Sequence, residues 1–229
     1  MILPLLVSVP HAGLRVPDEV ASYCILTEQQ IIEDGDEGAA EIYDFPDAIA
    51  QFVTTDIARA IVDMNRAEDD CRADGVVKTH TCWNVPVYDP FPPDGVIGQL
   101  LARHYRPYHA RLTECSAGGV RLGVDCHTMA ALGPPIGPGA GEERPAVCLS
   151  NGDGTCPAEW LESMARCFEQ AFERDVAIND PFRGGYIIRA HADELPWMQV
   201  ELSRAPFLSN AEKRKRVLAA LAEWCGMTG

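Results

Sequence analysis

The chain has 229 residues, enough for one sizeable hydrophobic core and short for two, so we expect a single domain over residues 1–229. Its 34 acidic and 19 basic residues give a net charge of −15, which repels nucleic-acid phosphates and anionic membranes. We therefore expect no nucleic-acid or membrane partner. The positive charge that an anionic substrate needs must be local.

Cysteine usage points to a reducing compartment. The nine cysteines are an odd number and form no C-x-x-C pair, so neither a disulfide framework nor a cysteine zinc site is indicated. The short apolar N-terminal run contains Pro4 and has no basic leader, which favours a buried first strand over a signal peptide or membrane span. A cytoplasmic location fits these features best.

Apolar and β-branched runs alternate with helical patterns along the chain. The runs predict strands at 5–9, 52–64, 121–128, 145–150, 175–179, 185–190 and 197–202. The helical patterns cover 96–115, 157–175 after Thr155 as a possible cap, and 210–226 from a capping Asn210. Two loops rich in proline and glycine are expected at 88–95 and 130–145. The alternation predicts an α/β fold with a mixed, mostly parallel central sheet flanked by helices.

Three predicted strands end in chemically unusual residues. His11 follows the first strand, His127 ends the strand over 121–128 two residues after Asp125, and Glu201 lies in the last strand. Ligand sites of open α/β sheets lie at the carboxyl ends of the strands. Two histidines and a carboxylate are a common zinc ligand set, and Asp125 could orient one imidazole. Histidines that are only hydrogen-bonded parts of the structure remain the alternative.

The third metal ligand is less defined, because the chain has no H-x-x-E or H-E-x-x-H motif. An acidic cluster lies where a helix over the segment "GAAEIYDF" should begin, and it offers Glu33, Asp34, Asp36 and Glu37. Acids at that place also complement the helix dipole, so a purely structural role stays open.

An anion-binding role is suggested by Asn65 and Arg66, which follow the apolar segment "AIVDM". An arginine there can hold a carboxylate in bidentate fashion, although an ordinary salt bridge is the alternative. Further candidates for a local cationic pocket are Arg59, Arg183, Arg189, Arg204 and His191.

Nine sequence segments occur in an order that resembles one known family. They are "SVPHAG", "DEGAAEIYDF", "VDMNR", "GVVKTHTCWNVPVY", "YRPYHARL", "VDCHTM", "NGDGTC", "PFRGGYIIRAHA" and "QVELSR". Together they are similar to the N-formylglutamate amidohydrolase (deformylase) family over almost the whole chain. The resemblance implies a fold related to zinc carboxypeptidases and aspartoacylase, with one zinc at the carboxyl ends of central strands. It also implies hydrolysis of N-formyl-L-glutamate to glutamate and formate, a step of histidine breakdown.

The resemblance also implies roles for individual residues. His11 and His127 would be zinc ligands, and the leading acid of "DEGA", Asp36, would be the third, with Glu37 as the alternative. Glu201 resembles the catalytic carboxylate of the wider superfamily. The pair of residues with which that superfamily binds the substrate carboxylate would correspond to Asn65 and Arg66. Arg189 and Arg204 are further candidates for substrate binding.

The expected partner is a small anionic substrate, and the sequence defines no oligomeric state. Two alternatives remain open. The same scaffold could remove another acyl group from an amino acid or cleave a peptide or cell-wall amide, with the loop over 130–145 as a specificity lid. The other alternative is a metal-free protein that binds acidic amino acids through Asn65 and Arg66. Two imidazoles and a carboxylate also accept divalent ions other than zinc.

Overall fold

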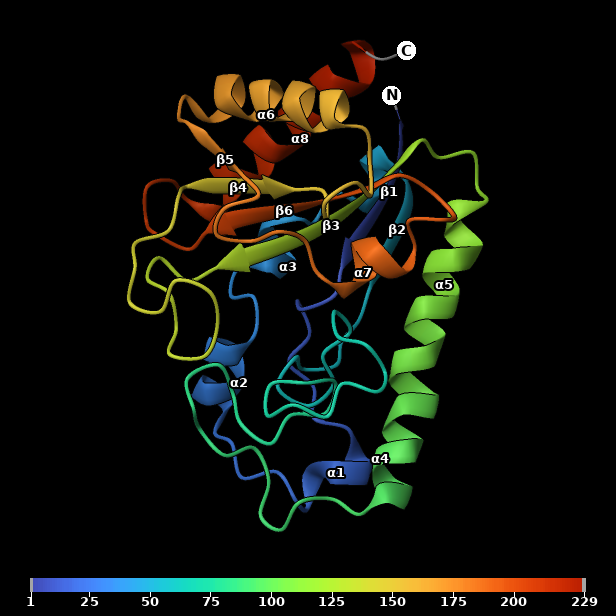
Figure 1. Ribbon diagram of the computed structural model, residues 1–229, viewed down its shortest axis with the longest axis vertical. Coiled ribbons are helices and arrows are strands. Elements are labelled where there is room, and N and C mark those ends of the chain that lie inside the picture. The colour runs from blue at the N-terminus through green and yellow to red at the C-terminus, as the bar shows by residue number, and fades with distance from the viewer. Residues whose placement is uncertain (1, 228–229) are drawn as a thin grey trace.

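The computed structural model describes residues 2–227 and contains a six-stranded sheet with the order β2-β1-β3-β6-β4-β5 (Figure 1). The strands are β1 (Leu3–Val9), β2 (Ile49–Thr54), β3 (Leu122–Met129), β4 (Val147–Ser150), β5 (Val176–Ile178) and β6 (Trp197–Ser203). β2, β1, β3 and β6 are parallel neighbours, whereas β4 runs antiparallel to β6 and parallel to β5. The predicted α/β fold with a mixed, mostly parallel sheet is confirmed.

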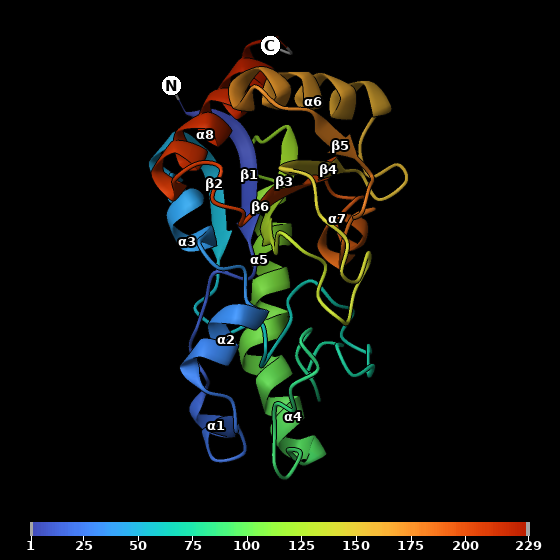
Figure 2. The same cartoon turned by 90° about the vertical axis from the view of Figure 1, so that its left-hand side faces the viewer.

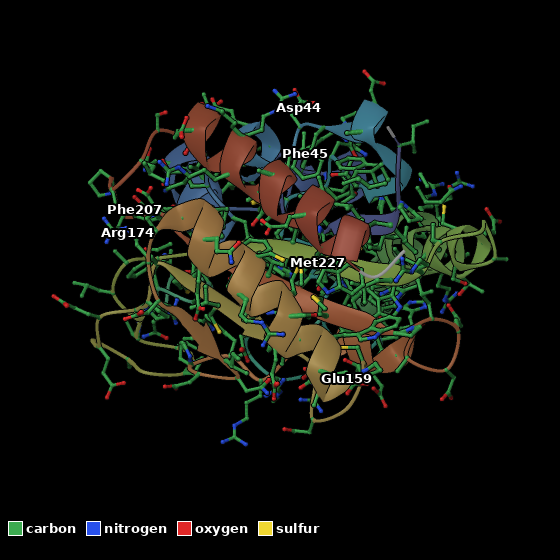
Figure 3. All side chains as sticks on the ribbon, turned by 90° about the horizontal axis from the view of Figure 1, so that it is seen from above. Asp44, Phe45, Glu159, Arg174, Phe207 and Met227 are labelled. Atoms are coloured by element: carbon green, nitrogen blue, oxygen red, sulfur yellow. The ribbon has the colours of Figure 1, made fainter. Side chains whose placement is uncertain are left out.

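Helices cover both faces of the sheet. One face carries α3 (Ala39–Ile42), α6 (Ala158–Phe172) and α8 (Asn210–Met227), with α6 and α8 packed beside one another above the strands (Figures 1 and 3). The other face carries a long continuous helix and the short α7. These elements are α4 (Asp94–Leu100), a π-helical turn η2 (Leu101–Tyr105), α5 (Arg106–Ser116) and α7 (Tyr186–Ala190). The short elements are α1 (Asp18–Ala21), α2 (Glu28–Asp34) and the 3₁₀ turn η1 (Pro46–Ala48). Figure 2 shows α1 and α2 at the opposite end of the molecule from α6 and α8.

The central strands are buried on both faces, and each face packs against its own hydrophobic cluster. All residues of β3 and β6 are buried. Gly123 of β3 is a glycine for a steric reason, since a Cβ there would meet the indole of Trp197 at 2.2 Å. On the outer layer, the Arg174 guanidinium stacks 5.1 Å from the ring of Phe207 (Figure 3). No helix within residues 2–227 has the length and apolar character to cross a membrane.

Two strand predictions were wrong. The strand predicted over 52–64 is β2, which ends at Thr54; beyond it the chain turns, with the N–H groups of Ile61 and Val62 both donating to Ala58 O. These residues are apolar because they fill the second cluster, not because the chain is extended. The segment 185–190 is helix α7, because a buried apolar run this short fits a helical turn as well as a strand.

The helix starts also differ from prediction. Thr155 does not cap α6: its hydroxyl is within hydrogen-bond range of Asn151 O and of Trp197 O in β6, and α6 begins at Ala158 after Pro157. α8 begins at Asn210, while the preceding Ser209 accepts a hydrogen bond from Glu212 N and is the cap. The helix expected through "GAAEIYDF" is only α3, and the acidic cluster lies at the end of α2 and in the turn that follows.

The parallel strands bring the polar residues of the sheet to one edge. In the strand register His127 pairs with Glu201 and Asp125 with Gln199, while Ser8 of β1 pairs with Asp125. Residues two apart on a strand face the same side. These side chains therefore share the face that carries α5 and α7, close to the carboxyl ends of β1, β3 and β6.

Candidate metal centre

Three buried side chains converge beyond the ends of β1 and β3. The Nδ1 atoms of His11 and His127 are 3.2 Å apart, and Asp36 Oδ2 lies 3.0 Å from His127 Nδ1 and 3.5 Å from His11 Nδ1. Ligands about 2.0–2.2 Å from a tetrahedral zinc lie about 3.3–3.6 Å from one another. The spacing of the three atoms is thus close to that of one face of a tetrahedral site.

Both imidazoles turn their other nitrogen to a buried carboxylate. His11 Nε2 lies 2.8 Å from Asp63 Oδ1, and His127 Nε2 lies 2.8 Å from Asp125 Oδ2. An ionised carboxylate only accepts hydrogen bonds, so each neutral ring carries its proton on Nε2 and leaves a lone pair on Nδ1. Two lone pairs and the Asp36 carboxylate then face a common point, and this donor set fits a divalent cation.

The two orienting carboxylates are themselves fixed. Asp125 accepts hydrogen bonds from the Ser8 hydroxyl at 2.7 Å and from the Asn65 amide at 3.3 Å. Asp63 accepts from Asn65 N at 2.9 Å and from Arg59 Nε at 3.1 Å. Such partners hold the imidazole planes in place before any ion binds.

Asp36, rather than Glu37, directs its carboxylate at the two histidines. The carboxylate of Asp36 is buried and accepts a hydrogen bond from Thr128 N at 3.1 Å, whereas the side chain of Glu37 is exposed. The peptide of Asp36 is anchored as well, because its N–H donates to His11 O at 3.2 Å. The turn after α2 therefore points this one acid at the two histidines.

Buried charges secure the turn that carries Asp36. Lys78 is fully buried and donates to Asp34 Oδ2 at 2.8 Å. Arg59 donates to Asp34 O at 2.9 Å, and Arg204 donates to Gly35 O at 2.9 Å. A buried ion pair is weak evidence of added stability; these three contacts instead fix the backbone beside Asp36.

The electrostatic surroundings favour positive charge at the convergence point. Burial alone would raise the pKa of Asp36, but His11 and His127 hold it well below the usual range. Burial alone would lower the pKa of His127, but Asp125 and Asp36 raise it well above the usual range. A cation bound at this point would balance the negative charges of the Asp36 and Asp125 carboxylates in the same way.

Glu201 lines the same cavity as the three candidate ligands. Its carboxylate is buried and accepts a hydrogen bond from Gln199 Nε2 at 2.8 Å, and Gln199 is held in turn by Gly185 N at 2.6 Å. Burial raises the pKa of Glu201 to about 7, although the charge of His127 opposes the shift. A carboxylate with a pKa near neutrality can both take and return a proton.

The predicted substrate-binding residues occupy different places. Arg66 and Arg204 line the cavity. Asn65 lines it too, but its amide already donates to Asp125, and its oxygen accepts from Ile187 N at 2.8 Å. This geometry supports a positioning role for Asn65 in place of the predicted substrate contact. Arg189 does not line the cavity: its guanidinium donates to Gly152 O and Arg183 O on the surface.

The other cationic candidates divide in the same way. Arg59 and the exposed Arg183 line the cavity. His191 does not: its Nε2 lies 3.0 Å from His109 Nδ1 and its Nδ1 lies 2.9 Å from Glu194 Oε2. These contacts support a structural role for His191.

Three residues at the site were not predicted. Asp63 precedes Asn65 by two positions in "VDMNR", and Lys78 is a single charge after the apolar pair "VV". Either isolated charge in an apolar run could have suggested a buried ion pair. Arg144 also lines the cavity, from the end of the loop over 130–145. A loop without periodicity gives no signal of where one of its side chains points.

Comparisons with known proteins agree with this geometry. A family model described as N-formylglutamate amidohydrolase matches residues 3–208. An N-formylglutamate deformylase of Pseudomonas putida is 27% identical over 227 residues, covering 92% of this chain and 84% of the relative. A second N-formylglutamate deformylase, of Pseudomonas aeruginosa, is 25% identical and covers 96% of this chain and 91% of the relative.

The fold has a close counterpart among solved structures. An N-formylglutamate amidohydrolase from Ralstonia eutropha JMP134 superposes with a TM-score of 0.76 at 20% identity, covering 100% of this chain and 96% of that chain. A gene product of Agrobacterium tumefaciens gives a TM-score of 0.69 at 14% identity, covering 98% of this chain and 88% of that chain. Since the family model spans most of the sequence, the chain belongs to the N-formylglutamate amidohydrolase family.

Proposed function

We propose that this protein is a zinc-dependent amidohydrolase that converts N-formyl-L-glutamate to L-glutamate and formate. The observation that carries the proposal is the convergence of His11 Nδ1, His127 Nδ1 and Asp36 Oδ2 in one cavity with Glu201. The substrate follows from the family and from the two Pseudomonas relatives, which are both N-formylglutamate deformylases.

The proposed reaction divides the work among named groups. His11, Asp36 and His127 would hold a zinc ion, which would polarise the formyl carbonyl and lower the pKa of water toward neutrality. Glu201 takes a proton from the attacking water as the oxygen bonds to the formyl carbon. The same carboxyl group then delivers that proton to the amide nitrogen, so the C–N bond breaks and leaves formate and the amine of glutamate.

The cavity supports a small substrate. Its volume is about 210 Å³, below the range usual for drug-sized ligands. This size favours an N-acyl amino acid over a peptide or cell-wall strand. Arg66 and Arg204 are the proposed contacts for substrate carboxylate, because guanidinium groups bind carboxylates through parallel N–H donors.

The metal-free binding protein is the weaker alternative. It gives no function to the convergence of two buried imidazoles and the buried carboxylate of Asp36. A cytoplasmic location belongs to the proposal as well. It is supported by the nine cysteines, which are all free thiols, because reducing compartments keep thiols in this state.

The function is tested by assaying the purified protein with zinc for formate release from N-formyl-L-glutamate. N-acetyl-L-glutamate serves as the matched substrate that differs only in the acyl group. We expect formate and glutamate in equal amounts and slower release of acetate. Faster release of acetate would replace the formyl substrate with another acyl group, and no release from either substrate would refute the proposal.

A further inference from the structure

Two arginines on the cavity wall have donors without an acceptor. The Nε atoms of Arg144 and Arg204 are buried and have no hydrogen-bond partner among residues 2–227. Their terminal nitrogens donate only to backbone carbonyls, and neither guanidinium forms an ion pair within the described chain. A buried N–H of a charged group stays destabilising until an acceptor, ideally an anionic one, reaches it.

The two arginines come from adjoining backbone segments. Arg204 N donates to Met129 O at 2.8 Å, and Arg144 N donates to Ala131 O at 2.9 Å, so both flank the few residues that follow β3. Burial lowers the pKa of Arg144, Glu201 counteracts this shift, and Arg204 adds to it. The charges of Arg144 and Arg204 therefore act on each other, and both arginines lie in the cavity that holds Glu201.

The cations of the cavity wall that are less exposed than Arg183 are already compensated, apart from Arg144 and Arg204. All three nitrogens of Arg66 have acceptors, and Asp74 supplies two of these acceptors, its carboxylate and its carbonyl. Arg59 pairs with Asp63, and Lys78 pairs with Asp34. The strongest uncompensated attraction for an anion within the buried wall is therefore at Arg144 and Arg204.

The cavity wall at Arg144 includes apolar side chains. The Arg144 guanidinium stacks 4.8 Å from the ring of Phe182, and Pro134 and Ile136 line the cavity from the same loop. Ile136 is fixed there, because its N–H donates to Cys82 O at 3.0 Å. Apolar side chains beside a guanidinium group suit a substrate side chain whose methylene groups carry a terminal carboxylate.

We propose that Arg144, with Arg204 beside it, binds the side-chain carboxylate of the substrate and thereby selects N-acyl amino acids with an acidic side chain. This inference rests on the proposed function and adds a specificity-determining residue to it. The α-carboxylate has no methylene groups before it. Arg66 remains its proposed contact, because each terminal nitrogen carries a second N–H besides the one donated to Asn65 O or Asp74 Oδ2. A neutral amide in place of the side-chain carboxylate leaves the half-buried charge of Arg144 without an anionic partner, and the site rejects the amide for that reason.

The test compares Arg144→Met with the parent on three substrates: N-formyl-L-glutamate, N-formyl-L-glutamine and N-formyl-L-isoglutamine. Methionine keeps an unbranched stem against Phe182 and removes the charge. We expect kcat/KM to fall about 10- to 100-fold, mostly through KM, for the two substrates that keep the side-chain carboxylate. N-formyl-L-glutamine, which lacks this group, is expected to change less than about threefold.

Arg111→Met is the control, since it removes one exposed positive charge of α5 that pairs with Glu114. A loss confined to substrates with a free α-carboxylate would overturn the assignment, as would an equal loss for all three substrates or no loss. Calorimetric binding of L-glutamate and L-glutamine to the zinc-loaded proteins gives a second readout without turnover. If the parent releases no formate, the proposed function fails, and the subsite then stands only if Arg144→Met weakens glutamate binding selectively.

Discussion

Glu201→Gln is expected to lower kcat for N-formyl-L-glutamate about 10²–10⁴-fold, the usual contribution of a general acid–base residue. The amide has the shape of the carboxylate, and its oxygen can still accept the hydrogen bond from Gln199. It cannot take a proton from water, however. Stopped assays of formate release over a range of substrate concentrations give kcat and KM separately, and KM is expected to change little.

Metal content distinguishes this catalytic role from a structural one. Glu201→Gln should retain the same amount of zinc as the parent after dialysis, because Glu201 is not among the three converging ligands. Glu143→Gln, at an exposed position of the loop over 130–145, is the control for the loss of one carboxylate. Full activity in Glu201→Gln, or loss of both metal and activity, would contradict the assignment of a base.

Asp36→Asn is expected to weaken zinc binding by more than the roughly 10–100-fold that loss of an outer hydrogen-bond partner costs. Asparagine still offers an oxygen to Thr128 N, so the backbone contact can persist while the anionic ligand is lost. Zinc affinity is measured by competition with a chromophoric chelator, and formate release should fall in parallel.

Glu37→Gln is the matched control for the third ligand, because it removes the neighbouring carboxylate, which is exposed. It should keep parental zinc affinity and activity. Thermal unfolding of both variants without metal checks that the fold is retained. Loss of zinc in Glu37→Gln with retention in Asp36→Asn would exchange the two assignments.

The sequence predicted the parts of the site that are attached to strands. His11, His127 and Glu201 could be located because each lies at or just beyond an apolar run, and parallel strands bring their carboxyl ends together. Asp125 could be paired with His127 because residues two apart on a strand share a face, and the structure confirms the contact. The strand ends therefore carry most of the predictable chemistry.

The parts that depend on turns were not predictable from pattern. Spacing alone could not choose Asp36 from the cluster of four acids. The choice depends on where α2 ends and on the hydrogen bond that the N–H of Asp36 donates to His11 O. Arg189 was expected at a strand end, but 185–190 forms a short helix that directs it to the surface. Arg144 gave no signal, because it ends a proline- and glycine-rich loop whose path depends on tertiary contacts.

Zinc-dependent hydrolysis is tested by a zinc titration of metal-depleted protein, with formate release from N-formyl-L-glutamate as the readout. The protein is stripped with a chelator, dialysed and assayed as zinc is added in measured amounts. We expect negligible activity without metal, and a rate of formate release that rises linearly with added zinc and stops rising at one zinc per chain. Full activity in the stripped protein, with no metal bound, would contradict zinc-dependent hydrolysis.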